Sequence, residues 1–552
     1  MPPARRTPAL VTTLVVGSLV VARLATAQAD PAFEARVDSA FARWSTTTPG
    51  CAVGVGQRGR VLLTKGYGMA NLEYGVPLGA GSVMESGSVA KQFTSAAIVL
   101  LQLDGKLRLD DDIRTHLPEV PDFGAPITIR NLLTHTSGLR DQWGLLSLTG
   151  NPPGVQVHTL PLILHLVTRQ QDLNFPPGTE YLYSNTGYAL AAVIVERVSG
   201  RSLAQFSKER IFGPLGMTHT EWRDDHQRIV AGRATAYQRR LNGTYATLMP
   251  FTNVYGNGGL LSTMGDLLKW NEALTTGMVP GGKALVEALE GRMRLTSGVT
   301  IPYALGLRHD TFQGRHEVAH SGSTAGYSTY MTRFPDDGVS IAVWCNASDA
   351  NPTAAARRIA SFLLPAARPG PQPSVASAAE ATPWVGRYRN EATDDLFDVI
   401  AGASGMVIRM PGGTSLAQSA GPATYRTTNG YTFTFQGTGA DRRAAVTDED
   451  GVSRDFRSSE SPASSSVRLD DYVGTYRSPE VGADYMIRAE DGKLVLRYAH
   501  LPPESLAPSY RDGFSGSGRT VRFVRDASGR VTELRVFAGR VRNVKFVRVA
   551  GG

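Results

Sequence analysis

The tetrad Ser88-Val89-Ala90-Lys91 is the strongest chemical signal in this sequence. Apolar residues follow it at helical spacing as far as Leu101, and Gly105 suits the end of a helix. Residues three apart share one helix face, so we expect the Lys91 amine beside the Ser88 hydroxyl. A serine becomes a nucleophile when a neighbouring base takes its proton. The first turn of a helix also offers free N–H groups that stabilise an oxyanion.

A second element is Tyr183-Ser184-Asn185, which precedes a helical pattern from about residue 188 to residue 197. A nearby ammonium would push the Tyr183 phenol toward phenolate, which predicts a general base. The Asn185 amide can donate to a substrate carbonyl and accept from a substrate N–H. Alone, such a triplet is typical of a turn, so its weight depends on the other elements.

The third element is His320-Ser321-Gly322, with Ser323 next, at the start of an alternating strand pattern. A donor or cationic side chain at His320 would hold a substrate carboxylate, and Gly322 lets a substrate approach the strand edge. The backbone N–H of Ser323, together with that of Ser88, would form an oxyanion hole.

The elements that must position these residues change type along the chain. Residues 50–73 alternate and turn like a hairpin, residues 86–275 are mostly helical, and residues 317–347 return to strands. A helix over residues 352–364 follows. Strands at both ends with helices between them predict an α+β domain whose sheet joins its N- and C-terminal segments.

The region beyond residue 381 repeats itself. The run Trp384–Tyr388 recurs as Tyr472–Tyr476, and Val407–Arg409 recurs as Val495–Arg497, both at a spacing of 88 residues. A shared spacing indicates duplicated units, and the short alternating strands predict two small all-β barrels. The predicted divisions are a signal peptide 1–27, a catalytic domain 28–364, a linker 365–381, a first barrel 382–460, a linker 461–467 and a second barrel 468–552.

The N-terminus reads as an export signal. Arg5 and Arg6 precede an apolar stretch, and Ala25-Thr26-Ala27 offers a cleavage site. The apolar stretch is too short to span a bilayer comfortably, so we expect no stable membrane anchor and a periplasmic or secreted protein. Of the formal charge of +8, three come from this segment, and the other basic residues are interleaved with acids. Nucleic-acid binding is therefore not indicated.

The chain has two cysteines, Cys51 and Cys345, and both lie in strand-like runs. In an oxidising compartment they could form one disulfide, and two unpaired buried thiols are equally compatible with the sequence. So few cysteines do not indicate a metal site.

Ser-x-x-Lys, Tyr-x-Asn and His-x-Gly in this order resemble the penicillin-recognising serine hydrolases, which include class C β-lactamases, D-alanyl-D-alanine carboxypeptidases, D-aminopeptidases and related esterases. The resemblance spans residues 40 to about 365 and includes the runs 133–139, 211–217 and 258–263. It implies a β-lactamase/transpeptidase-like domain that works through a covalent acyl-enzyme on Ser88, without a cofactor or metal. Lys91 and Tyr183 would move protons, while Asn185, His320 and Gly322 would bind a small-molecule or peptide substrate.

One departure from the lactamase pattern bears on the substrate. His320-Ser321-Gly322 stands where lactamases have Lys-Thr-Gly, and His-x-Gly is more similar to D-Ala peptidases and D-aminopeptidases. A neutral imidazole holds a carboxylate less firmly than an ammonium does. We therefore expect hydrolysis of peptides or amides containing D-amino acids, with esterase or β-lactamase activity as the alternative. By the same resemblance, the lipocalin-like barrels narrow the active site or mediate homo-oligomerisation.

Two readings from other classes compete with this one. His316-Glu317-Val318-Ala319-His320 fits a zinc-protease motif, but that motif needs a helix and the flanking glycines and serines do not favour one. In the other, the enzyme site is vestigial and the barrels bind an apolar ligand.

Overall fold

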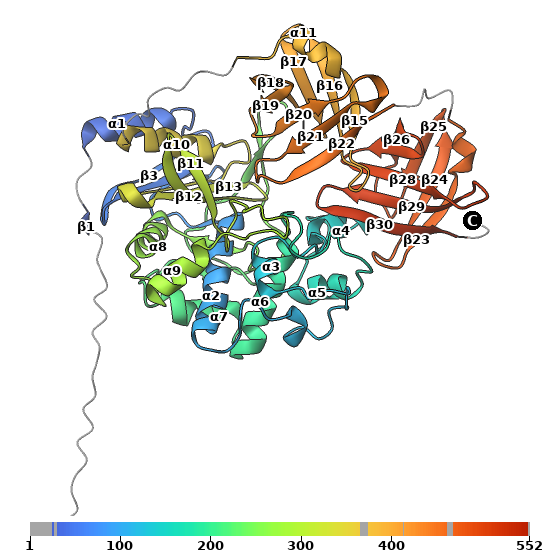
Figure 1. The fold of residues 1–552 in the computed structure, drawn as a ribbon. Helices are drawn as coiled ribbons and strands as arrows, with labels where there is room; N and C mark the ends of the chain where they lie inside the picture. Colours follow the sequence, from blue (N-terminus) through green and yellow to red (C-terminus); the bar gives the residue numbers. More distant parts are fainter. Residues whose placement is uncertain (1–24, 27–29, 365–373, 412, 461–466, 550–552) are drawn as a thin grey trace, which may run out of the picture.

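The computed structural model describes residues 25–26, 30–364, 374–411, 413–460 and 467–549. Figure 1 shows an α+β domain followed by two β-barrels, which confirms the predicted fold class. Apart from Ala25–Thr26, which forms the short strand β1, the predicted signal peptide lies outside the described residues.

The α+β domain is built on a seven-stranded sheet in the order β1-β3-β2-β14-β13-β12-β11. Its main strands are β2 (Cys51–Gln57), β3 (Arg60–Tyr67), β11 (Arg308–Phe312), β12 (Arg315–Thr324), β13 (Tyr327–Phe334) and β14 (Val339–Cys345). β14 pairs antiparallel with β2 and so joins the two ends of the domain, as the sequence predicted. Cys51 and Cys345 face each other in this pairing and form a disulfide.

Helices cover both faces of the sheet. α1 (Pro31–Ala40) and α10 (Pro352–Leu363) pack on one face, and α8 (Met264–Thr276) packs on the other. Behind α8 lie α2 (Lys91–Leu103) and α6 (Asn185–Ser199), whose contact forms the centre of the largest apolar core. α2 is buried on every side from Lys91 to Leu101, so its first residues are held rigidly.

Shorter elements complete the domain around these layers. They are α3 (Ile129–Leu133), α4 (Gln142–Leu148), α5 (Leu160–Thr168), α7 (Leu203–Ser207), α9 (Gly282–Glu290) and a small sheet of β6 (Met84–Glu85), β10 (Leu260–Ser262) and β7 (Glu221–Trp222). α4 and α5 lie on the side of the domain that faces the second barrel (Figure 1).

Each repeat forms a closed, antiparallel, eight-stranded barrel: the first barrel is β15–β22 and the second is β23–β30. The strands of the first are Gly386–Arg389, Leu396–Gly402, Gly405–Met410, Gly413–Gly421, Thr424–Thr427, Thr432–Gln436, Arg443–Thr447 and Ser453–Ser459. Those of the second are Gly474–Ser478, Ala483–Glu490, Lys493–Arg497, Glu504–Tyr510, Gly513–Gly516, Arg519–Arg525, Val531–Ala538 and Val541–Arg548. The first repeated run leads into the first strand of each barrel and the second lies in the third strand, so the duplication read from the sequence is confirmed.

The interior of the first barrel is filled by aromatic side chains. Tyr388 stacks on Phe397 with ring centroids 4.8 Å apart, and Phe433 and Phe435 are buried beside them. Tyr476 and Tyr485 are likewise buried in the second barrel. This packing argues against the alternative in which the barrels hold an apolar ligand.

The predicted linker is shorter than expected at its C-terminal end. Residues 365–373 lie outside the described residues, but α11 (Ala378–Ala381) packs against β16 and β17 of the first barrel. Ala376 and Ala381 are fully buried in that barrel's core. Small apolar side chains in an Ala- and Ser-rich run can therefore cap a barrel, although composition alone suggests a solvated linker.

Candidate active site

Ser88 lies in a short 3-10 helix, η1 (Gly87–Ala90), that leads directly into α2. The sequence predicted the first turn of an α-helix, and this tighter turn is a correction. Gly87 has a φ of +50°, and a Cβ there would lie 2.6 Å from the Ser323 nitrogen of β12. Residues three apart eclipse each other in a 3-10 helix. Lys91 Nζ accordingly lies 3.0 Å from Ser88 Oγ.

The Lys91 amine is fully buried and touches three oxygen atoms. Besides Ser88 Oγ, it lies 3.0 Å from Asn185 Oδ1 and 2.6 Å from the Asn257 carbonyl oxygen. Burial lowers the pKa of Lys91 well below its usual value, and the positive charge of Arg540 lowers it further. A neutral amine has two N–H bonds and one lone pair, so it can donate to the two carbonyl-type oxygens and accept the Ser88 proton.

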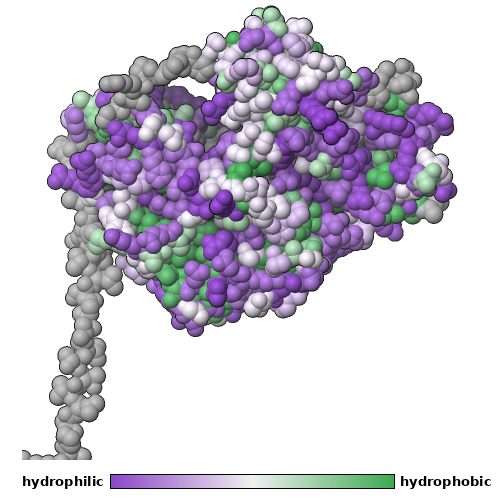
Figure 2. All heavy atoms as spheres, in the orientation of Figure 1, coloured by the Kyte–Doolittle hydropathy of each residue, from purple (hydrophilic) through white to green (hydrophobic). Residues whose placement is uncertain are grey.

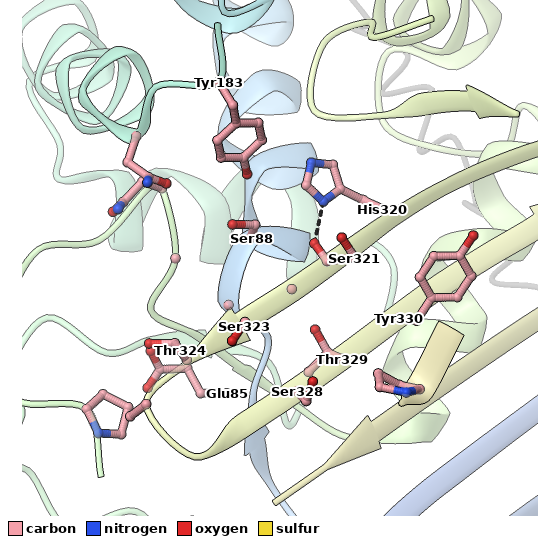
Figure 3. A pocket seen from close by; sticks show the side chains of 18 of the residues that line it. Glu85, Ser88, Tyr183, His320, Ser321, Ser323, Thr324, Ser328, Thr329 and Tyr330 are labelled. Carbon is pink, nitrogen blue, oxygen red and sulfur yellow. Dashed lines mark hydrogen bonds between the residues drawn. The ribbon is translucent and has the colours of Figure 1, made fainter. Parts of the chain in front are cut away.

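The Tyr183 side chain points its hydroxyl toward Ser88 (Figure 3). That hydroxyl is buried, and burial raises the pKa of Tyr183 despite the lowering effects of Ser88 and Arg540. The phenolate expected from the sequence is therefore not favoured, because the charged form would lack solvation. The raised pKa of Tyr183 disfavours it as the base, and the lowered pKa of the neighbouring Lys91 amine favours Lys91 in that role.

Asn185 is the first residue of α6, and Asp141 fixes its orientation. Asp141 Oδ2 accepts hydrogen bonds from the Asn185 backbone nitrogen at 2.7 Å and from Nδ2 at 3.0 Å. The amide oxygen is thereby turned toward Lys91, and Asn185 still lines the cavity. The residue thus holds the amine in place as well as offering the substrate contact predicted from the sequence.

His135 supports the Tyr183 segment from behind. Its Nδ1 accepts a hydrogen bond from the Ser184 N–H at 3.1 Å, and its ring lies 4.1 Å from the Tyr183 ring. Burial lowers the pKa of His135 well below its usual value, so the imidazole is neutral. His135 is a positioning residue for Tyr183.

His320 lies on β12, next to η1, and both of its ring nitrogens are engaged. Nε2 is 2.7 Å from the Tyr303 hydroxyl. Nδ1 is 2.5 Å from the Ser321 carbonyl oxygen (Figure 3). Nδ1 therefore donates to the carbonyl, and Nε2 accepts from the phenol. Burial lowers the pKa of His320 to about 3. At neutral pH this side chain supplies no positive charge for a carboxylate, so its predicted substrate contact rests on hydrogen bonding alone.

Glycine lets β12 and η1 approach closely. A Cβ on Gly322 would lie 2.1 Å from the Ser86 carbonyl oxygen and 3.0 Å from the Ser88 nitrogen. No larger residue fits there without moving the backbone. Ser88 and Ser323 thus come from adjacent segments, and the oxyanion hole formed by their N–H groups stays a prediction.

A cavity of about 1090 Å³ opens over Ser88. Its lining comes from all three bodies: Ser88, Tyr183, Asn185 and His320 from the α+β domain, Glu449 and Asp450 from the first barrel, and Arg540 from the second. Asp450 forms an ion pair with Arg308 of β11. Both barrels therefore contribute to the wall of the cavity over Ser88, and the narrowing of the active site suggested by the resemblance stays a prediction.

Comparison with known families decides the class of this site. The Beta-lactamase family matches residues 26–365, which is more than half of the chain. The chain belongs to the Beta-lactamase family. With a serine beside a buried lysine, this Beta-lactamase-family protein is a serine hydrolase. A separate family, described as a domain of unknown function (DUF3471), matches residues 458–547 and so covers the second barrel.

Named relatives match this Beta-lactamase-family protein over different shares of its length. It is 27% identical over 524 residues to a D-aminopeptidase of Cereibacter sphaeroides, covering 91% of this chain and 96% of the relative. It is 33% identical over 294 residues to Penicillin-binding protein 4* of Bacillus subtilis, covering 50% of this chain and 64% of that protein.

Solved structures show the same fold. The octameric penicillin-binding protein homologue from Pyrococcus abyssi matches with a TM-score of 0.55 and 24% identity over 85% of this chain and 98% of that one. A penicillin-binding protein from Bacillus halodurans matches with a TM-score of 0.51 and 22% identity over 60% of this chain and 98% of that one.

The zinc-protease motif of the sequence does not form a metal site among the described residues. Residues 315–324 form the strand β12, in which His316 lies 2.9 Å from His309 while His320 contacts Tyr303. The two imidazoles thus have separate partners, whereas a helix would turn them toward one ion.

Sequence reasoning missed four residues of the site. Asp141 and Tyr303 carry no motif, although each orients a motif residue. Asn257 contributes its backbone carbonyl, which accepts a hydrogen bond from Lys91. Its position directly before the run 258–263, which resembles the family, could have indicated a role in the site. Arg540 lies in the second barrel, and nothing near it in the sequence indicates a role at Ser88.

Proposed function

We propose that this serine hydrolase cleaves peptides or amides containing D-amino acids through an acyl-enzyme on Ser88. The observation that carries the proposal is the Lys91 amine, buried without a carboxylate contact and 3.0 Å from Ser88 Oγ. The D-aminopeptidase relative, which spans the barrels as well, supports the substrate class.

Acylation follows from the protonation states of the resting site. The Ser88 proton moves to Lys91 as Oγ bonds to the substrate carbonyl carbon, and the N–H groups of Ser88 and Ser323 stabilise the oxyanion. As the tetrahedral intermediate collapses, the Tyr183 phenol gives its proton to the leaving amine and recovers one from the Lys91 ammonium. Lys91 is neutral again when the acyl-enzyme has formed.

Deacylation uses the same groups. A water molecule gives a proton to Lys91 while its oxygen bonds to the acyl carbon. The Lys91 ammonium then returns that proton to Ser88 Oγ as the ester bond breaks. No second carboxylate base is needed, because the lowered pKa of the buried amine lets Lys91 act as the base in both half-reactions.

The acyl-enzyme is tested by mass spectrometry of the intact protein after incubation with a fluorophosphonate and, separately, with a penicillin. We expect one adduct in the wild-type protein, no adduct in Ser88→Ala, and labelling slowed about 10²- to 10⁴-fold in Lys91→Met. Ser328→Ala is a matched control, because Ser328 also lines the cavity (Figure 3), whereas the hydrogen bonds of Lys91 go to Ser88, Asn185 and Asn257. An adduct that persists in Ser88→Ala would overturn the proposal.

The substrate class is tested with paired anilides. D-alanine p-nitroanilide should be hydrolysed with a higher kcat/KM than its L-enantiomer, and penicillin turnover should be slow because His320 supplies no positive charge. Equal hydrolysis of the enantiomers, or hydrolysis of simple esters alone, would move the function to the esterase alternative.

We propose that the chain is exported and cleaved after Ala27. The Arg-led apolar N-terminus and the Cys51–Cys345 disulfide support this, because disulfides persist in oxidising compartments. Among the described residues, no helix has the length and apolarity needed to cross a membrane. N-terminal sequencing of the protein from a periplasmic or culture fraction should start at Gln28, and an intact cytoplasmic N-terminus would contradict it.

We also propose that the protein forms homo-oligomers. The Pyrococcus abyssi homologue is described as octameric, and this chain shares its fold over 85% of its own length. Light scattering of the purified protein should show more than one chain per particle. A monomer would leave the narrowing of the cavity as the role of the barrels.

A further inference from the structure

Arg540 occupies the turn between β29 and β30 of the second barrel, and this turn enters the active site. The guanidinium lies 4.6 Å from the centre of the Tyr183 ring. The backbone carbonyl of Arg540 accepts hydrogen bonds from Asn174 Nδ2 at 3.0 Å and from the Asp141 N–H at 3.4 Å. The turn is therefore tied to the segment that orients Asn185, which fixes where the guanidinium can reach.

The other arginines that line the cavity each have a carboxylate partner. Arg223 pairs with Glu85, Arg308 with Asp450, and Arg357 with Glu317. Within the described ranges, the Arg540 side chain has no hydrogen bond or ion pair, and it is exposed to the cavity. An unpaired guanidinium held over an aromatic ring is preorganised to accept an anion.

Among the described residues, no other cationic side chain on the cavity lining is free to bind an anion. Lys91 has no exposed surface, and His320 is neutral with both nitrogens engaged. Besides Arg540, one other charged side chain of the described residues lines the cavity without an ion pair. It is Glu449, a carboxylate on the first barrel. The charge next to Ser88 that a substrate can reach is thus positive, and it comes from the second barrel.

We propose that Arg540 is a specificity-determining residue that binds a carboxylate of the substrate while Ser88 attacks the neighbouring carbonyl. This rests on the proposed acyl-enzyme function and narrows its substrate class. One edge of the planar guanidinium donates two parallel hydrogen bonds to the carboxylate, and the Tyr183 ring packs against its flat face. Substrates with a free ammonium at this position are disfavoured by like charge, unlike substrates that carry an acid.

The carboxylate can come from either side of the scissile bond, so two matched substrate pairs are needed. N-acetyl-D-alanyl-D-alanine and its C-terminal carboxamide differ in a carboxylate on the leaving group. N-succinyl- and N-acetyl-D-alanine p-nitroanilide differ in a carboxylate on the acyl group. The readout is the ratio of kcat/KM for the acid to that for its neutral partner, because any change in Lys91 affects both equally.

In at least one pair the wild-type ratio should exceed one, and Arg540→Gln should lower it on the order of 10- to 100-fold. Arg540→Lys should retain part of the preference, since it keeps the charge and loses the paired donors. Arg530→Gln, another turn arginine of the same barrel, and Glu449→Gln, a charge on the same cavity, should not lower the ratio. A ratio that is unchanged by Arg540→Gln in both pairs overturns the proposal.

A second measurement distinguishes failure of the Arg540 proposal from failure of the proposed hydrolase function. If none of the four compounds is hydrolysed, their protection of Ser88 from the fluorophosphonate still measures binding. The acids should then protect the wild-type protein at lower concentration than their neutral partners, and this difference should disappear in Arg540→Gln. Equal protection by acid and neutral compounds would refute the role of Arg540 even in an inactive protein.

Discussion

The two barrels arise from one repeat but attach to the catalytic domain in different ways. The second barrel shares an apolar core with the domain: Leu145, Leu146 and Leu148 of α4 and Ile163 and Leu166 of α5 are buried among its side chains. The first barrel has a core of its own and adds only Val452 to a small cluster beside Tyr181 and Tyr303. In Figure 2, hydrophilic surface predominates on the visible face of both barrels.

Buried charges follow the same division. Arg140 and Glu480 pair across the second interface, with the guanidinium fully buried and the carboxylate 3% exposed. At the first interface Glu180 contacts Arg454 at 3.3 Å, and it also contacts Arg542 of the second barrel at 3.1 Å. The two barrels thus differ in the contacts that their outer surfaces make with the catalytic domain. The second packs through a shared apolar core, while the first is held mainly by polar contacts.

Breaking the buried pair should have the largest effect. Glu480→Ala leaves Arg140 buried without a counter-charge, and we expect it to lower the free energy of unfolding by about 3–5 kcal/mol. Because Arg140 precedes Asp141, the loss should also disturb Asn185 and reduce activity. Urea unfolding at pH 7 and kcat/KM for an anilide measure both effects.

The double variant Arg140→Met/Glu480→Leu separates charge burial from general damage. Removing both charges should recover much of the lost stability, although the hydrogen bond from Arg140 to the Arg542 carbonyl is also lost. A single variant that costs less than about 1 kcal/mol would mean that this pair behaves like a surface ion pair.

At the first barrel, Asp450 should make stability depend on pH. Burial raises the pKa of Asp450 to about 6, although Arg308 lowers it. The folded protein therefore binds the proton more tightly than the unfolded chain, so stability falls as pH rises from about 4 to about 6 and stays lower above that. Asp450→Asn should flatten this decline, because the group that takes up the proton on folding is removed.

Urea unfolding of wild-type and Asp450→Asn at pH 4.5, 6 and 8 measures this difference. Glu449→Gln is the control, because Glu449 is the exposed neighbour on the same turn. Were Asp450→Asn less stable at pH 8 than at pH 4.5 by as much as the wild type, another group would be responsible.

The smallest expected effect concerns the field at the catalytic amine. Arg540 lowers the pKa of Lys91, so Arg540→Gln should raise it and move the acid limb of kcat/KM for a neutral substrate to higher pH, by about one unit or less. Asp450→Asn should leave that limb in place, since Asp450 does not act on Lys91. A limb that shifts equally in both variants would mean that the two barrels influence the amine alike.

Local sequence predicted much of the catalytic centre. Ser88 and Lys91 are three residues apart, so a single helical turn brings them together whatever the rest of the chain does. The hairpin-like strands, the helix after Asn185 and the repeated barrels were also readable, because each depends on periodicity and turns within a short segment. The protonation states of Tyr183 and His320 were not, because they depend on burial by distant elements.

The sequence by itself determined the nucleophile, its amine and the duplication of the barrels, since all three are encoded by spacing along the chain. Only the tertiary structure decided that the pKa of Lys91 is lowered and that of Tyr183 raised, because desolvation comes from packing. It also decided which barrel touches the chemistry: Arg540 lies more than 350 residues from Tyr183 in sequence and 4.6 Å from its ring in space. Contacts between residues so far apart in the sequence depend on how whole domains pack against one another, and short sequence motifs do not predict that packing.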